Sequence, residues 1–157
     1  MKNTWEWQKK QIISCVPMIF ASHFTLCMDI YPNDDFPTLE RDGTIYVEIC
    51  GSEDVLRRIG TRVEFDEETQ LAVFRVGDRL LAVSNICPHQ HNPSLHEGEI
   101  NAQDCTITCP LHGWTYSLET GKSTSSSHSR VHTYRVFEEH GFVYLEKPAP
   151  IEPSWSF

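Results

Sequence analysis

Apolar and polar residues alternate over short runs from residue 44 onward, and this pattern predicts an all-β fold. Residues 71–76 and 80–83 flank Gly77-Asp78, so they are expected to form a β-hairpin with a tight turn. Only residues 52–58 favour a helical turn or two, with Ser52 as the N-cap. Further strands are predicted at 45–49, 62–65, 99–101, 106–108, 114–118, 131–137 and 142–146, the last two joined by a turn over 138–141. Strands at this spacing indicate a sandwich or a barrel.

The two ends of the chain differ from this pattern. Residues 1–43 are predicted to be an N-terminal extension of unclear role: a packed segment or tail, a degenerate export signal, or an upstream piece outside the functional domain. Pro17 and His23 interrupt its apolar run, so no transmembrane span is expected. Its end, residues 31–43, is acidic and turn-rich like a linker. Residues 148–157 form a Pro-rich tail, which leaves 44–147 as the domain.

Composition narrows the possible functions. The 157 residues suit one domain, and 13 Lys and Arg against 22 Asp and Glu give a formal charge of −9. This charge argues against nucleic acid as a partner and favours a partner with a basic face. Six Cys are too few for a disulfide scaffold, while eight His in a chain of this length suggest metal chemistry.

Two loops combine cysteine with histidine. The first contains Cys87-Pro88-His89, and the second contains Cys109-Pro110-Leu111-His112. Zinc fingers and ribbons space paired ligands by two to four residues, which Cys-x-His does not match. Blue copper needs a weak axial ligand, and methionine is scarce. A [2Fe–2S] cluster with two Cys on one iron and two His on the other fits both loops. The alternative is a chance spacing of two buried thiols and two surface histidines.

Through these loops and the downstream 118–121 segment, the sequence resembles the Rieske iron–sulfur family over about residues 45–145. The resemblance implies stacked antiparallel sheets with a small cluster-binding subdomain made of two loops. It also implies that Cys87 and Cys109 hold the buried iron of one [2Fe–2S] cluster, and that His89 and His112 hold the outer iron.

Differences between this sequence and the respiratory members of the family indicate the branch to which it is similar. Respiratory members resemble this sequence but carry a second cysteine in each loop, where this chain has Asn92 and Leu111. They also place a serine near the cluster where this chain has Trp114, although Tyr116 remains available as a donor. We therefore expect the ferredoxin and oxygenase branch, with a potential nearer about −150 mV than +300 mV. Where that branch has glycine this chain has His91, and Asn92 is expected to adopt the left-handed turn instead.

The other histidines and cysteines are expected to have structural or solvent roles. His91 and His96 are predicted to be solvated, with cluster tuning or partner docking as the alternative for His91. Cys105 is predicted to be a small core residue. Three further cysteines show no pairing pattern and three further histidines show no ligand spacing: Cys15, Cys27, Cys50, His128, His132 and His140.

The resemblance implies a one-electron carrier between a reductase and a terminal oxidoreductase. The alternatives are a small iron–sulfur subunit of a larger reductase complex, similar to a nitrite reductase small subunit, or a non-redox module on the same fold. No dinucleotide fingerprint appears and no second metal domain fits, so we expect no independent substrate site. Partners are expected to dock near His89 and His112, on a rim that includes Pro88, Gln90, His91, Leu111 and Trp114. Free thiols favour the cytoplasm, with export as the alternative.

Overall fold

The computed structural model describes residues 29–33 and 35–149, and this part of the chain is built almost entirely from β-strands. A five-stranded sheet has the order β1 (Asp29–Ile30), β4 (Thr61–Glu64), β5 (Gln70–Val76), β6 (Arg79–Ser84), β12 (Thr133–Tyr134). A four-stranded sheet has the order β13 (Val136–Glu139), β14 (Phe142–Glu146), β3 (Thr44–Gly51), β2 (Thr38–Arg41). Every pairing in these sheets is antiparallel except β1 with β4. The predicted all-β class is confirmed.

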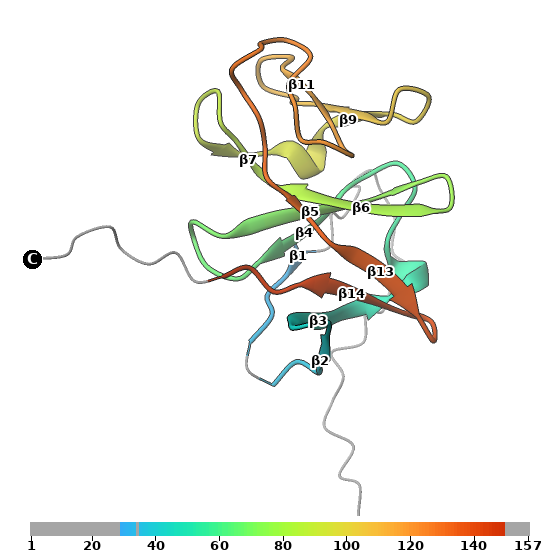
Figure 1. The fold of residues 1–157 in the computed structure, drawn as a ribbon. Helices are drawn as coiled ribbons and strands as arrows, with labels where there is room; N and C mark the ends of the chain where they lie inside the picture. Colours follow the sequence, from blue (N-terminus) through green and yellow to red (C-terminus); the bar gives the residue numbers. More distant parts are fainter. Residues whose placement is uncertain (1–28, 34, 150–157) are drawn as a thin grey trace, which may run out of the picture.

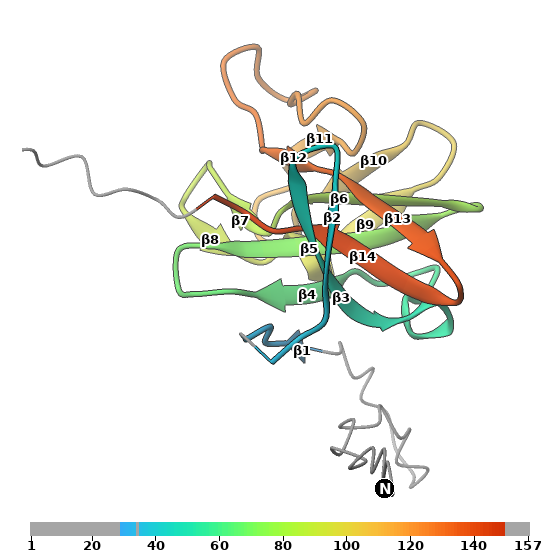
Figure 2. The same ribbon diagram turned by 60° about the horizontal axis from the view of Figure 1, so that its bottom comes forward.

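A third unit, which we call the subdomain, is formed by residues 85–132 between β6 and β12 (Figure 1). It contains a three-stranded sheet, β11 (Thr115–Ser117), β10 (Thr106–Thr108), β9 (Glu99–Asn101), and a two-stranded ribbon, β7 (Ile86–Cys87) and β8 (Asn92–Pro93). The 3₁₀ turns η1 (Ser52–Asp54) and η2 (Leu95–Glu97) are the helical elements of the described residues. In Figure 1 the five-stranded sheet lies between this subdomain above and the four-stranded sheet below, and in Figure 2 β2 of the four-stranded sheet crosses in front of β5.

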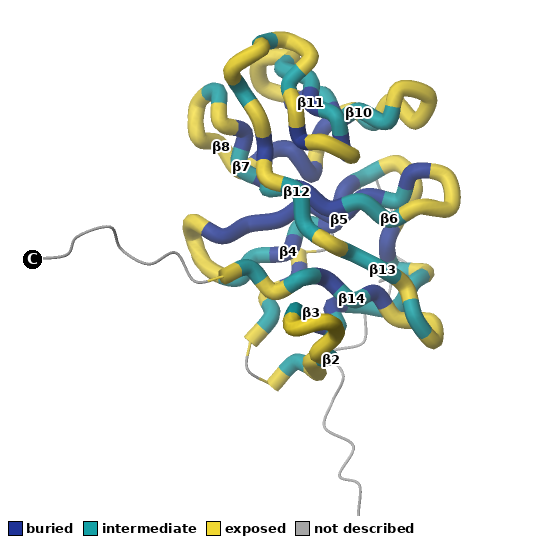
Figure 3. Tube along the Cα trace, viewed as in Figure 1, coloured by how far each residue is buried: buried dark blue, intermediate teal, exposed yellow. Residues whose placement is uncertain are grey.

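The five-stranded sheet is covered on both faces, which gives the domain two apolar cores. Toward the four-stranded sheet, Leu71 and Val73 of β5 pack in one cluster with Val143. Toward the subdomain, Phe74 packs in a second cluster with Tyr116. Because alternate residues of a strand face opposite sides, an apolar run along β5 is required. Figure 3 shows most of this strand as buried; within it, only Arg75 is partly exposed. Burying each large apolar side chain contributes about 1.5–3 kcal/mol.

The predicted hairpins are confirmed, with the backbone that their turns require. Gly77 between β5 and β6 has φ +62°. Between β13 and β14, His140 and Gly141 have φ +52° and +83°, the two positive values typical of a type I′ turn. Gly141 provides the second of these at little steric cost.

Three expectations about local structure are wrong. The single strand predicted at 131–137 is divided, because β12 pairs with β6 whereas β13 pairs with β14 in the other sheet. The predicted helical segment is one 3₁₀ turn that begins at Ser52, and its N-cap is Gly51, whose N–H donates to Asp54 Oδ2 over 3.1 Å. The expected linker at 31–43 contains β2, which forms a hairpin with β3.

The predicted extension at 1–43 is described only from residue 29, where β1 pairs with β4 and Ile30 joins the core. The expectations for residues 1–28, including the export signal, lie outside the described residues, as does most of the tail at 148–157. Within the described ranges, no helix has the length and apolar character needed to cross a membrane.

Candidate metal centre

The two predicted loops lie side by side in the subdomain, and each is held by a short pair of strands. The first loop turns between β7 and β8, which pair Cys87 with Asn92. The second turns between β10 and β11, where Cys109 N–H donates to Trp114 O over 2.8 Å and Gly113 N–H to Cys109 O over 3.0 Å. Gly113 has φ +70°, a backbone conformation that favours glycine. The structure places the two thiols in one core cluster and the two imidazole rings in contact with each other.

The thiols face the core while the imidazoles face outward. Cys87 and Cys109 are 2% and 1% exposed, whereas His89 is half-buried and His112 is exposed. Both thiols pack in the core cluster that contains Phe74 and Tyr116. A group bound here would have one side in an apolar, low-dielectric environment and the other side near solvent.

Hydroxyl groups contact both sulfur atoms. Tyr116 OH lies 3.5 Å from Cys87 Sγ, and Ser94 Oγ lies 3.5 Å from Cys109 Sγ. Burial raises the pKa of Tyr116 to about 12, helped by the bond to Cys87. The sequence indicated the tyrosine but not the serine, because nothing in the linear order places Ser94 beside the second loop.

The two thiols differ in acidity. Burial raises the pKa of Cys87, and the Tyr116 hydroxyl only partly opposes this. Burial also acts to raise the pKa of Cys109, but hydrogen bonds that include those from the Ser94 hydroxyl and the Leu111 backbone N–H outweigh it. The pKa of Cys109 is therefore lower than usual, which favours the thiolate that metals bind.

His89 lies between the other two rings of the site. Its ring stacks on Trp114 with centroids 4.5 Å apart and an interplanar angle of 25°. It meets His112 edge to face, with centroids 4.9 Å apart. Its Nδ1 atom is buried and has no hydrogen-bond partner. A buried, unsatisfied nitrogen is costly, so this atom is a candidate ligand.

These residues fit a [2Fe–2S] cluster. Among the described residues, no group of three or more His, Cys, Asp or Glu side chains is arranged to hold a single metal ion. A two-iron cluster needs two ligands on each iron, and here two buried sulfurs lie behind two imidazoles. The unpartnered Nδ1 of His89 is the observation that a missing ligand bond would explain.

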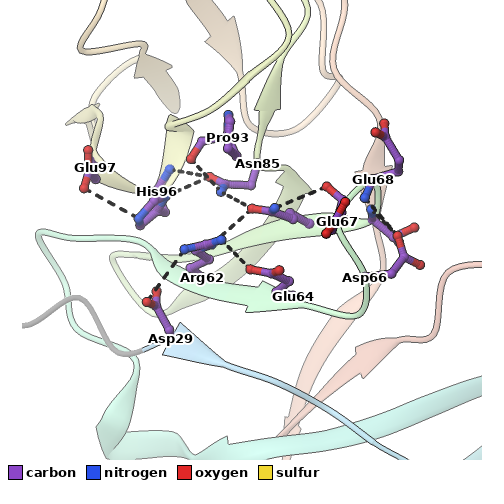
Figure 4. A network of polar contacts seen from close by, with 12 residues as sticks. Asp29, Arg62, Glu64, Asp66, Glu67, Glu68, Asn85, Pro93, His96 and Glu97 are labelled. Carbon is purple, nitrogen blue, oxygen red and sulfur yellow. Dashed lines mark hydrogen bonds and ion pairs between the residues drawn. The ribbon is translucent and has the colours of Figure 1, made fainter.

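Two expectations around the first loop are wrong. His91, not Asn92, has the left-handed backbone, with φ +49°. His96 is buried, at 6% exposed, whereas the sequence suggested a solvated residue. Its N–H and Nδ1 lie 2.8 and 3.0 Å from Asn85 Oδ1 (Figure 4). Because that oxygen accepts, Nδ1 carries the proton, and burial lowers the pKa of His96.

The other residues behave more nearly as expected. His91 is exposed, and its Nε2 lies 3.2 Å from Glu68 Oε2 in the loop between β4 and β5. Cys105 is half-buried against the core, in a turn with φ +54° just before β10. The rim around the imidazoles is exposed at Pro88, Gln90, Leu111 and His112, while Trp114 is half-buried.

Comparison with known protein families gives one match that covers most of the described chain. The model of the Rieske-like [2Fe-2S] domain family matches residues 45–146. This range contains both loops and both core clusters except for the contribution of β1.

Individual relatives agree with this match. The ferredoxin subunit of 3-phenylpropionate/cinnamic acid dioxygenase from Shigella flexneri is 32% identical over 90 residues, which are 57% of this chain and 83% of the relative. The ferredoxin in a solved complex of reduced oxygenase and oxidized ferredoxin in carbazole 1,9a-dioxygenase is 32% identical with a TM-score of 0.56, over 62% of this chain and 98% of that one. A Mycobacterium tuberculosis structure named for an NADH-dependent nitrite reductase small subunit shares the fold, with a TM-score of 0.62 at 19% identity over 68% and 97% of the two chains.

Proposed function

This chain belongs to the family of Rieske-like [2Fe–2S] domains, and we propose that it is a one-electron carrier that passes electrons between a reductase and a terminal oxidoreductase. The observation that carries the proposal is the arrangement of two buried thiols behind two outward imidazoles, one of each from either loop. The cofactor of this family is a Rieske-type [2Fe–2S] cluster, which supplies reversible one-electron chemistry when bound.

We propose that Cys87 and Cys109 are the ligands of one iron and that His89 and His112 are the ligands of the other. The thiols are buried in an apolar core and the pKa of Cys109 is lowered, both of which suit a permanent thiolate ligand. The buried Nδ1 of His89 has no other partner, and Trp114 stacks on the same ring and fixes its orientation.

The ligand assignment is tested at the exposed histidine. We expect His112→Cys to retain iron, to alter the visible and EPR spectra and to lower the reduction potential, because a thiolate is a charged and stronger donor than imidazole. A variant with the wild-type spectrum and potential would show that His112 is not a ligand.

The partner is proposed to dock on the rim around His89 and His112. His112 is exposed. Leu111 beside it is 50% exposed and is one of the few large apolar side chains on the surface of the described residues. Electron-transfer contacts are small and transient, so a few such side chains are sufficient. The imidazoles give the shortest path from the buried site to the surface.

The relatives indicate the class of partner. The similar proteins include the ferredoxin subunit of 3-phenylpropionate/cinnamic acid dioxygenase and a ferredoxin in complex with the oxygenase of carbazole 1,9a-dioxygenase. We propose that the partner of this chain is likewise the terminal oxygenase component of a Rieske oxygenase system, and that it presents a basic face to this acidic chain. Rates that fall steeply with added salt would support this charge complementarity.

The experiment for the function is a reconstituted electron-transfer assay. The purified chain is expected to be red-brown, to contain two irons and two sulfides per chain and to give the reduced-state Rieske EPR signal. With an NADH-dependent ferredoxin reductase and an oxygenase, it should restore product formation. A colourless chain with one zinc would reject the proposal. A stable stoichiometric complex with a reductase subunit at native concentration would favour the small-subunit alternative.

Docking is tested with a matched pair of surface variants. Leu111→Ser is expected to slow electron transfer to the oxygenase without changing the reduction potential. Ile45 of β3 has nearly the same exposure, 49%, but lies in the four-stranded sheet, so Ile45→Ser should leave the rate unchanged. Equal rates for the two variants would place docking elsewhere.

We also propose that the chain works in the cytoplasm. Cys87, Cys105 and Cys109 are thiols rather than disulfides, as expected in a reducing compartment. Fractionation of cells with an antibody against the chain tests this, and its recovery from an extracytoplasmic fraction would contradict it.

A further inference from the structure

The hydroxyl of Ser94 is aimed at the thiol of the other loop. Ser94 follows the first loop, yet its Oγ contacts Cys109 Sγ of the second loop at 3.5 Å. Tyr116 lies in β11, the strand after the second loop, yet its hydroxyl contacts Cys87 Sγ of the first loop at the same distance. Each thiol therefore has one hydroxyl partner, and the two contacts cross between the loops.

Ser94 is in a position where its hydroxyl would normally have another role. It is the residue before η2, and a serine at such a position usually accepts a hydrogen bond from the first turn of its own helix. Here the side chain makes no such bond. The residue is only 5% exposed, so the hydroxyl is directed to the sulfur rather than to water.

Asn85 holds Ser94 in this place. It is fully buried, and its Nδ2 donates to Pro93 O over 3.1 Å, while its backbone oxygen accepts from Leu95 N–H over 3.2 Å. Its Oδ1 accepts from the N–H of His96 over 2.8 Å (Figure 4). The residues on both sides of Ser94 are therefore fixed to the residue that begins the subdomain, which holds the Ser94 backbone in place beside the second loop.

We propose that Ser94 is a second residue, alongside Tyr116, that sets the reduction potential of the centre. The inference rests on the proposed function, because it requires the two sulfurs to be iron ligands. Hydrogen bonds to ligand sulfur stabilise the more negative, reduced state and thereby raise the potential. Each hydroxyl contacts a different sulfur, so removing either one is expected to lower the potential.

The test is a redox titration of Ser94→Ala followed by visible absorbance. At a fixed ambient potential, the ratio of reduced to oxidised protein should fall about three- to tenfold, where tenfold corresponds to about 59 mV for one electron. Iron and sulfide content should stay at the wild-type level. The matched control is Ser52→Ala, because the Ser52 hydroxyl is also buried but lies in η1, outside the subdomain. Its potential should equal that of the wild type.

A second pair keeps the test decisive if Ser94→Ala fails to incorporate iron. Thr and Val have nearly the same shape and differ in the hydroxyl, so Ser94→Thr should have a higher potential than Ser94→Val. Equal potentials within this pair, or a wild-type potential in a loaded Ser94→Ala, would overturn the inference. A wild-type chain that binds no [2Fe–2S] cluster would instead reject the proposed function, so the two failures are distinguishable.

Discussion

Removing the side chain of Asn85 should destabilise the domain far more than its size suggests. In Asn85→Ala, the backbone N–H and the Nδ1–H of His96 both lose their acceptor, and His96 is only 6% exposed. A buried donor left without a partner costs about 1–3 kcal/mol, so the two together cost about 2–6 kcal/mol. Domains of this size are typically stable by about 5–15 kcal/mol, which makes this a large fraction of the total.

The matched control for this prediction is Asn101→Ala. Asn101 at the end of β9 also bonds through its side chain, donating to Asp104 Oδ2 and accepting from the N–H groups of Gln103 and Asp104. It is exposed, so water replaces these partners and the expected cost is below about 1 kcal/mol.

Urea unfolding followed by far-UV circular dichroism measures both variants against the wild type. The midpoint for Asn85→Ala should fall steeply while the slope stays unchanged, as expected for a loss of native-state stability. If Asn85→Ala costs no more than Asn101→Ala, the reasoning from burial is refuted. In that case the contacts of Asn85 with Pro93 and His96 are not what holds the segment after the first loop in place.

Three further predictions concern single positions. Burial lowers the pKa of His96, so the unfolded chain takes up its proton more readily and the free energy of unfolding should fall as pH drops below about 6.5; His96→Gln should lose this slope in urea titrations. Gly121 has φ +71°, and a Cβ there would lie 2.0 Å from Val131 O, so Gly121→Ala should cost more than about 2 kcal/mol in thermal unfolding. Gly43→Ala, with φ +74° and nothing within 4 Å, should cost about 1 kcal/mol, and equal losses would contradict the steric argument. Tyr116→Phe should retain iron but lower the reduction potential in spectroelectrochemical titration, and an unchanged potential would show that its hydroxyl does not act on the sulfur.

Local signals in the sequence were sufficient for most strands and for the candidate ligands. The hairpin expected at 71–76 and 80–83 is observed as β5 and β6 within about one residue at each end, because alternation and a glycine turn act over neighbouring positions. The Cys-x-His and Cys-x-x-His loops were identified for the same reason, since the spacing of ligands is itself a local property.

The features that could not be predicted depend on partners that are distant in the sequence. His96 is polar and lies beside a loop, and its burial depends on contacts that the linear order does not show, above all the bond of its Nδ1 to Asn85. The division of the strand expected at 131–137 depends on whether β6 or β14 is the neighbour, which alternation alone does not encode. Ser94 carried one weak signal, a hydroxyl directly before a short turn, but its direction toward Cys109 depends on how the loops meet.

The way in which residues 85–132 leave and rejoin the five-stranded sheet has a consequence for evolution and engineering. The two ends of this segment are adjacent, since Ser84 N–H donates to His132 O over 2.8 Å and Val83 pairs with Thr133. The whole subdomain is therefore an insertion at the end of the hairpin that β6 and β12 form. The entropy cost of closing a loop grows slowly with its length. A β-hairpin of another protein is therefore expected to accept the same segment as an insertion. That hairpin would need an apolar residue in place of Phe74, which here packs against the core of the subdomain.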